Sequence, residues 1–127
     1  MSLETFLRKL FPPTPKKKEP YECHNSFKIA GVTFKNKDGS SRQSILKKIK
    51  DFDKAELKVY EYNGKQVIGV YTTDGKQVGN IKEKDIPYVL NRLETKTDIV
   101  FYNINSFYSF EDKKDIWYGE IIIFFMQ

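Results

Sequence analysis

The 127-residue sequence contains one cysteine, Cys23, and one histidine, His24. A single cysteine excludes an internal disulfide framework. One cysteine and one histidine supply neither the ligands of an ordinary zinc site nor a supported Cys–His catalytic pair. On an extended segment these adjacent side chains would also point to opposite sides. We therefore expect no metal and no cofactor, and the scarcity of cysteine favours a cytoplasmic location.

Long apolar runs are absent as well. The longest, residues 121–126, is far below the roughly 18 residues that span a bilayer, and no signal-peptide pattern opens the chain. The sequence also has no glycine-rich phosphate loop and no credible pairing of a nucleophile with a base. These absences predict a protein that neither spans a membrane nor catalyses a reaction.

The clearest pattern that is present begins at Phe27. Apolar residues largely alternate through 27–35, which predicts a half-buried strand with an irregularity at Gly31. After a polar turn at 36–39, Ser40 or Ser41 can cap a helix. The apolar residues of that helix share one face: Ile45, Leu46 and Ile49.

Positive charge is concentrated in the same region. Residues 35–50 hold six basic residues against one acidic residue, an excess of five that equals the formal net charge of the whole chain. With the free N–H groups at a helix start, these residues suit a phosphate or another anion. A solvated helix face is the alternative. The candidate anion-binding residues are Lys35, Lys37, Ser41, Arg42, Lys47 and Lys48.

A three-stranded meander is predicted next. Residues 56–62 alternate, Asn63-Gly64 is a strong hairpin signal, and 66–72 supply the returning strand. Asp74-Gly75 then turns the chain into a third strand at 77–81. Residues 82–93 change to a helical period, and Pro87 suits the first turn of that helix.

The tail is β in character. Residues 99–104 and 116–125 predict two strands around a polar turn at 111–115, and consecutive apolar residues in the last strand predict burial on both faces. Aromatic residues gather around this hairpin. Core filling is the favoured interpretation and a stacking platform the alternative. They are Phe107, Tyr108, Phe110, Trp117 and Tyr118.

The first twenty residues read as a separate segment. Apolar residues from Leu3 to Phe11 fall at helical spacing, and prolines then enclose three lysines in a stiff basic linker. This amphipathic helix can dock on the domain, on another subunit or on a membrane surface. We divide the chain into this segment, 1–20, and a β domain, 21–127.

Three runs together resemble the HIRAN domain: AGVTFKNKDGSSRQSIL at 30–46, ELKVYEYN at 56–63 and VIGVYTTDGKQVGNI at 67–81. The likeness covers roughly residues 25–125. It implies a small OB-like β-barrel that binds single-stranded DNA, by capturing a free 3′ end in the best-known relatives, and a role in DNA repair.

The resemblance also implies site residues. The family's substrate-facing positions match Thr33, Phe34 and Lys35. Its Asn-Pro-Tyr-Asp-like segment, whose Tyr and Asp hold the terminal nucleotide, falls on 61–65, where the aligned Tyr and Asp positions are not matched. Tyr60 or Tyr62 can supply stacking instead, with buried cross-strand tyrosines as the alternative.

The sequence thus predicts a mainly β fold: a small OB-like six-stranded antiparallel barrel with two short helices, plus the N-terminal amphipathic helix. The predicted function is non-catalytic binding of single-stranded DNA. The alternative is a protein-interaction or homo-oligomerisation module that uses residues 3–11 and the C-terminal strand.

Overall fold

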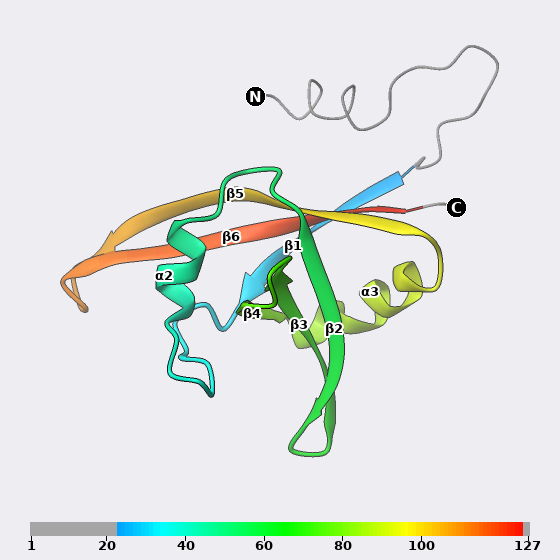
Figure 1. Ribbon diagram of the computed structural model, residues 1–127, viewed down its shortest axis with the longest axis horizontal. Coiled ribbons are helices and arrows are strands. Elements are labelled where there is room, and N and C mark those ends of the chain that lie inside the picture. The colour runs from blue at the N-terminus through cyan, green and yellow to red at the C-terminus, as the bar shows by residue number, and fades with distance from the viewer. Residues whose placement is uncertain (1–22, 126–127) are drawn as a thin grey trace, which may run out of the picture.

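The computed structural model describes residues 23–125, which form one antiparallel sheet with the strand order β2-β3-β4-β1-β6-β5 (Figure 1). The predicted mainly β fold of six antiparallel strands and two short α-helices is therefore confirmed, whereas the predicted N-terminal helix lies outside the described residues. No helix in the described range is long and apolar enough to cross a membrane. The elements are β1 (Cys23–Ala30), α2 (Arg42–Lys47), β2 (Ala55–Tyr62), β3 (Lys65–Thr72), β4 (Gln77–Ile81), the 3-10 helix η1 (Glu83–Asp85), α3 (Ile86–Leu93), β5 (Thr97–Ser109) and β6 (Lys114–Phe125).

Strand β1 joins the two halves of the sheet. Its residues 23–28 pair with β6, and its last two residues, Ile29 and Ala30, pair with β4. The strand was predicted to continue to Lys35, which is wrong. Gly31 has a φ of 67°, in the left-handed region, and its carbonyl accepts from the Phe34 amide at 3.2 Å. The chain therefore turns directly after Ala30.

The two edge strands meet at one point, so the sheet curls on itself. Lys54, just before β2, forms an isolated bridge with Val100 of β5. The Phe52 amide donates to the Phe101 carbonyl at 2.7 Å, and the Phe101 amide donates to the Asp53 carbonyl at 2.8 Å. These bonds protect part of both edges, which would otherwise expose unpaired backbone groups.

Each helix places apolar residues in the interior. Leu46 of α2 and Val89 of α3 are fully buried, and the core strands contribute Ile68, Val70, Val78, Phe101, Ile121 and Ile123. Gln43 fastens α2 to β6: its Oε1 accepts from the Trp117 amide at 2.7 Å and its Nε2 donates to the Trp117 carbonyl at 2.9 Å. This side chain mimics a neighbouring strand at that position.

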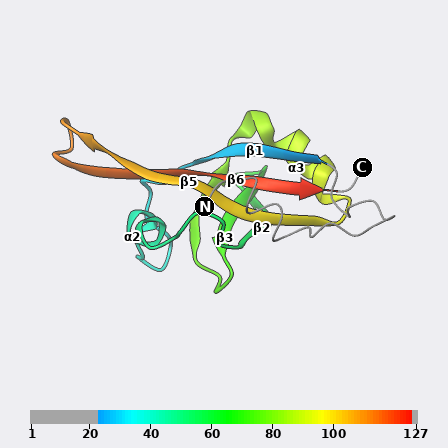
Figure 2. The same ribbon diagram turned by 90° about the horizontal axis from the view of Figure 1, so that it is seen from above.

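The far end of the β5–β6 hairpin projects beyond the other strands (Figure 2). The prediction that its aromatic residues fill the core is wrong for three of them: Phe107 is 54% exposed, Tyr108 52% and Phe110 86%. Trp117 does pack against the core. Among the described residues no second layer covers the projecting part, so these three side chains are exposed.

Candidate nucleic-acid interface

The turn after β1 determines where the family-matched residues lie. Thr33, Phe34 and Lys35 are all exposed, and the Phe34 ring is 67% exposed. A Cβ on Gly31 would lie 3.2 Å from Arg42 Nη1 and 3.4 Å from Phe34 Cδ2. An exposed aromatic ring therefore sits beside the guanidinium of a residue eight positions later in the chain.

The start of α2 is built differently from the anion site that the sequence predicted. Ser41 caps the helix, with its Oγ accepting from the Ser44 amide at 3.2 Å. Asp38 occupies the neighbouring donors, since the Ser40 hydroxyl donates to its Oδ1 at 2.6 Å and the Ser40 amide at 2.9 Å. These bonds, the hydroxyl's first, hold the pKa of Asp38 below its usual range. The chain's own carboxylate thus takes the place of the predicted phosphate.

Arg42 was predicted to belong to an exposed basic patch, but only 8% of it is exposed. Its Nε donates to Asn36 Oδ1 at 2.8 Å, and its Nη1 donates to the Gly31 carbonyl at 3.0 Å and to Asn80 Oδ1 at 3.2 Å. All three acceptors are neutral. Within the described residues no carboxylate pairs with this guanidinium, so its charge is only partly compensated.

One terminal nitrogen of Arg42 is left for a ligand. Nη2 donates to no described residue. In the described part of the chain, every fully buried side-chain nitrogen has a hydrogen-bond partner, so Nη2 is not fully buried. Nη2 therefore keeps access to solvent. A guanidinium held by three neutral acceptors, with the Nη2 donors unused by the described residues, is preorganised to bind an anion such as a phosphate.

A second group of polar side chains continues from Arg42 along the sheet. The Tyr60 hydroxyl accepts from Asn80 Nδ2 at 2.7 Å and from Gln77 Nε2 at 3.3 Å. Because Asn80 Oδ1 also accepts from Arg42, one amide connects the guanidinium to the tyrosine. Tyr60 itself is half-buried. Its ring is thus held in place by hydrogen bonds at its outer end.

The Tyr71 ring occupies the space beside Gly69, two residues earlier on the same strand. A Cβ on Gly69 would come within 2.6 Å of Tyr71 Cε1, so only glycine leaves room for the ring. Lys58 Nζ lies 4.9 Å from the centre of this ring, a cation–π contact. Burial and the nearby Tyr60 raise the pKa of Tyr71 above its usual value, and the positive charge of Arg42 opposes this rise.

We call this connected surface the arginine–tyrosine face. Its members combine exposed or half-buried aromatic rings with cations and amides, which is the chemistry of single-strand binding surfaces. From the sequence, three of its members are predicted, Phe34, Arg42 and Tyr60, and the other four are not. The face consists of Phe34, Arg42, Lys58, Tyr60, Tyr71, Gln77 and Asn80.

A signal for two of the missed residues was present in the sequence. The two-residue turn at Asn63-Gly64 fixes the register of β2 against β3, so that Lys58 lies opposite Gly69. Residues two apart on a strand share a face. Counting from the turn places the two missed residues, Lys58 and Tyr71, on the same side of the sheet as the predicted Tyr60. Gln77 and Asn80 depend on the register of β4, which has a bulge at Val70/Tyr71.

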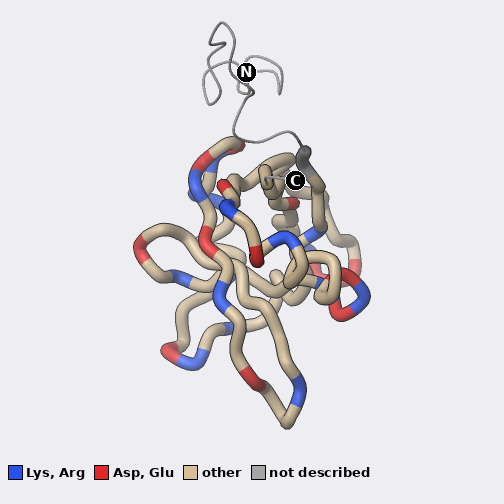
Figure 3. Tube along the Cα trace, turned by 90° about the vertical axis from the view of Figure 1, so that its right-hand side faces the viewer, with Lys and Arg blue, Asp and Glu red and all other residues tan. Residues whose placement is uncertain are grey.

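The remaining predicted residues are not joined to this face by any described contact. Lys37, Lys47 and Lys48 are exposed on the loop and on α2, and Tyr62 is 58% exposed at the end of β2. Figure 3 shows acidic residues interspersed among the lysines and arginines along the visible trace. In that view the positive charge does not form one continuous stripe.

The described residues contain no cluster of three or more His, Cys, Asp and Glu side chains that could hold a metal ion. The arginine–tyrosine face itself consists of hydrogen-bonding groups, cations and aromatic rings. Comparison with known proteins found no matching family model, no matching curated protein and no matching solved structure.

Proposed function

We propose that this chain binds single-stranded nucleic acid, DNA in the first place, through the arginine–tyrosine face, and that it catalyses no reaction. Arg42 carries the proposal. The residue is only 8% exposed, and its guanidinium is bonded only to neutral acceptors among the described residues and has no described partner at Nη2. A positive charge without a described counter-ion, near one exposed and two half-buried aromatic rings, is what a phosphate with a flanking base requires.

The binding mode follows from the neighbours of Arg42. A backbone phosphate meets Nη2, a base stacks on the exposed Phe34 ring, and a second base lies against Tyr71, whose other neighbour is Lys58. Lys35, on the loop next to Phe34, adds attraction for adjacent phosphates. Binding should weaken as salt rises, because neutralised phosphates release their counter-ions.

The resemblance to the HIRAN family supports the same choice of ligand and makes DNA repair a proposed context. It matches Thr33, Phe34 and Lys35 to substrate-facing positions, and these residues are exposed here. In the segment 61–65 the aligned positions of the family's Tyr and Asp are not matched. We therefore expect the chain to bind along a strand, with equal affinity for free and blocked 3′ ends.

The test is fluorescence anisotropy of the full chain with labelled single-stranded DNA of about 15 nucleotides, the upper range of a small barrel's site. Probes carry a free or a phosphate-blocked 3′ end, and a blunt duplex and an RNA strand serve as competitors. Phe34→Ala should weaken single-strand binding roughly 5- to 150-fold, the loss of one stacked base.

The matched control is Phe110→Ala, because Phe110 is an even more exposed phenylalanine, at 86%, on the projecting hairpin. It should bind as the unaltered chain does. If Phe34→Ala and Phe110→Ala behave alike, the arginine–tyrosine face is not the interface. If the unaltered chain binds no strand even at low salt, the proposed function is wrong.

A second candidate function is protein interaction, now centred on a different element from the one the sequence predicted. Residues 120–125 of the C-terminal strand are paired with both β1 and β5, and residues 121–125 are buried, so this part of the strand offers no free edge to a second copy. The exposed aromatic tip of the β5–β6 hairpin is the observation that favours interaction. A solution mass that falls on Phe110→Ser would support it.

A further inference from the structure

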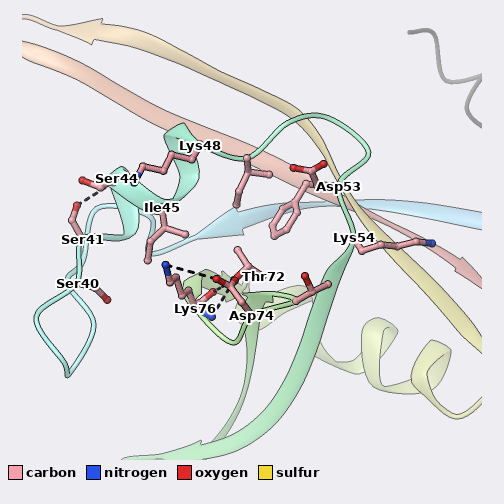
Figure 4. A pocket seen from close by; sticks show the side chains of 13 residues that line it. Ser40, Ser41, Ser44, Ile45, Lys48, Asp53, Lys54, Thr72, Asp74 and Lys76 are labelled. Atoms are coloured by element: carbon pink, nitrogen blue, oxygen red, sulfur yellow. Dashed lines mark hydrogen bonds and ion pairs between the residues drawn. The ribbon is translucent and has the colours of Figure 1, made fainter.

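A cavity of about 540 Å³ lies between α2, the β3–β4 turn and the segment before β2 (Figure 4). This volume falls within the roughly 300–1,000 Å³ of ordinary small-molecule sites. Apolar side chains form one part of its lining: Ile45, Ile49 and Phe101. Hydroxyl groups form another part: Ser40, Ser41, Ser44, Thr72 and Thr73. The cavity thus offers an apolar surface bordered by hydrogen-bonding groups.

Some charged groups of the cavity already have partners within the chain and others do not. Its two carboxylates already have partners: Asp53 accepts from the Lys50 amide at 2.9 Å, and Asp74 accepts from the Thr72 hydroxyl. The Thr72 bond, first among several causes, holds the pKa of Asp74 below its usual range. Lys54 Nζ is held by both oxygens of Asp98, at 2.6 and 2.7 Å.

Two lysines at the cavity are available for an anion. Lys48 pairs with no described carboxylate. Lys76 approaches Asp74 only at 3.7 Å, with both side chains more than 60% exposed, so that solvent weakens this pair. An anionic group entering from solvent therefore meets two ammonium groups, while both carboxylates are turned to bonds within the chain.

The cavity and the arginine–tyrosine face lie on opposite sides of the same short segments. Ser41 lines the cavity, whereas its neighbour Arg42 belongs to the face. Tyr71 and Gln77 belong to the face, and their neighbours Thr72 and Lys76 line the cavity. Consecutive residues of an extended chain point to opposite sides. Residues that are neighbours in the chain therefore contribute to both surfaces.

We propose that this cavity accepts one unstacked nucleotide of the bound strand. The base packs against Ile45 and Ile49, which are only partly buried, the serine and threonine hydroxyls bind its polar edge or its sugar, and the attached phosphate lies between Lys48 and Lys76. This inference rests on the proposed function and adds to it. The arginine–tyrosine face holds the strand, while the cavity holds one of its bases.

The test blocks the cavity without touching the face. Ser44 is exposed on α2 and its side chain makes no described hydrogen bond, so Ser44→Trp should fill the cavity in a folded protein. The matched control is Gln66→Trp on the exposed end of β3, which lines neither surface. Ser44→Trp should bind single-stranded DNA about tenfold more weakly, the loss of one base contact, with the salt dependence unchanged. Gln66→Trp should bind as before.

Backbone amide NMR shifts, recorded with thymidine monophosphate and separately with the oligonucleotide, distinguish a free nucleotide from one within a strand. We expect both ligands to shift the Ser44, Thr73 and Lys76 amides. Normal strand binding by Ser44→Trp, with no shifts at these amides, would overturn the cavity proposal and leave the proposed function standing. If the chain binds no strand, the proposed function falls. The monophosphate alone then decides, since shifts at these amides support the cavity site and their absence overturns it.

Discussion

The two halves of the sheet differ in what they place on their outer sides. In β6, consecutive residues 121–125 are all buried, so neither side of that segment faces solvent. In β3, Val70 is fully buried while its neighbour Tyr71 is only half-buried, facing Lys58 across a glycine. The continuous apolar half stabilises the fold. The alternating half leaves one side of each strand for polar chemistry, and the arginine–tyrosine face lies there.

The largest expected effect tests whether stability depends on the apolar half. Phe101 of β5 is fully buried and touches the junction of the two edge strands. Phe101→Ala should lower the free energy of unfolding by about 3–5 kcal/mol, because it leaves a cavity in the core. Phe110→Ala should change it by less than about 0.5 kcal/mol. Urea unfolding monitored by circular dichroism measures both free energies. Equal losses of stability in the two variants would show that stability does not depend on the apolar half.

The second effect concerns the charge beneath the polar half. Arg42→Gln removes donors to Gly31, Asn36 and Asn80 and should cost about 2 kcal/mol of stability, the usual range for bonds to a charged group. Arg42→Lys keeps the charge but not the fork, so it should recover stability only in part. If both variants unfold at the same urea concentration as the unaltered chain, Arg42 does not organise the face.

A smaller effect is expected from a single hydroxyl. Tyr60→Phe removes the acceptor of Asn80 Nδ2 and Gln77 Nε2 and should cost about 1 kcal/mol. Tyr62→Phe is the control, because Tyr62 is 58% exposed and has no described hydrogen bond. Thermal unfolding measures both. A larger loss for Tyr62→Phe would contradict the network around Asn80.

The smallest effect is a titration. The pKa of Tyr71 is raised above 10.0, so its neutral form contributes stability that is fully present below pH 10 and is lost as the pH rises through the folded value. Gly69→Ala should push the ring toward solvent and return its pKa toward 10, since a Cβ at Gly69 would lie 2.6 Å from the ring. Carbon-13 NMR of the tyrosine rings reads both values, and an unchanged pKa in Gly69→Ala would contradict the geometry.

Much of the fold followed from local patterns. Alternation and the Asn63-Gly64 turn predicted β2, β3 and β4, and both residues of that turn have positive φ as such a hairpin requires. The apolar run at 121–125 predicted burial on both faces, which the structure confirms. Ser41 caps α2, as expected. The division into residues 1–20 and 21–127 stays a prediction, as does the helix at 3–11.

The candidate site was harder to predict, because its members come from five segments: the loop after β1, α2, β2, β3 and β4. Charge counting placed Arg42 in a solvated patch, although three neutral oxygens hold it beneath the surface. Lys58 and Asn80 carry no motif of their own. Their importance comes from their partners: Lys58 lies over the Tyr71 ring, and Asn80 donates to the Tyr60 hydroxyl of β2. Residue type alone gives no account of such pairings.

By itself the sequence determined which segments become strands, because period-two alternation and left-handed turn residues act over a few neighbours. It also determined which strand is buried on both faces, because apolar residues leave water whatever their partners are. Only the tertiary structure decided that Arg42 is buried without a described carboxylate, that Phe34 stands beside it, and that a cavity lies behind them. These features depend on the register of β3 against β4 and on the turn after Ala30. Such long-range placement is the sum of many weak contacts that no local pattern contains.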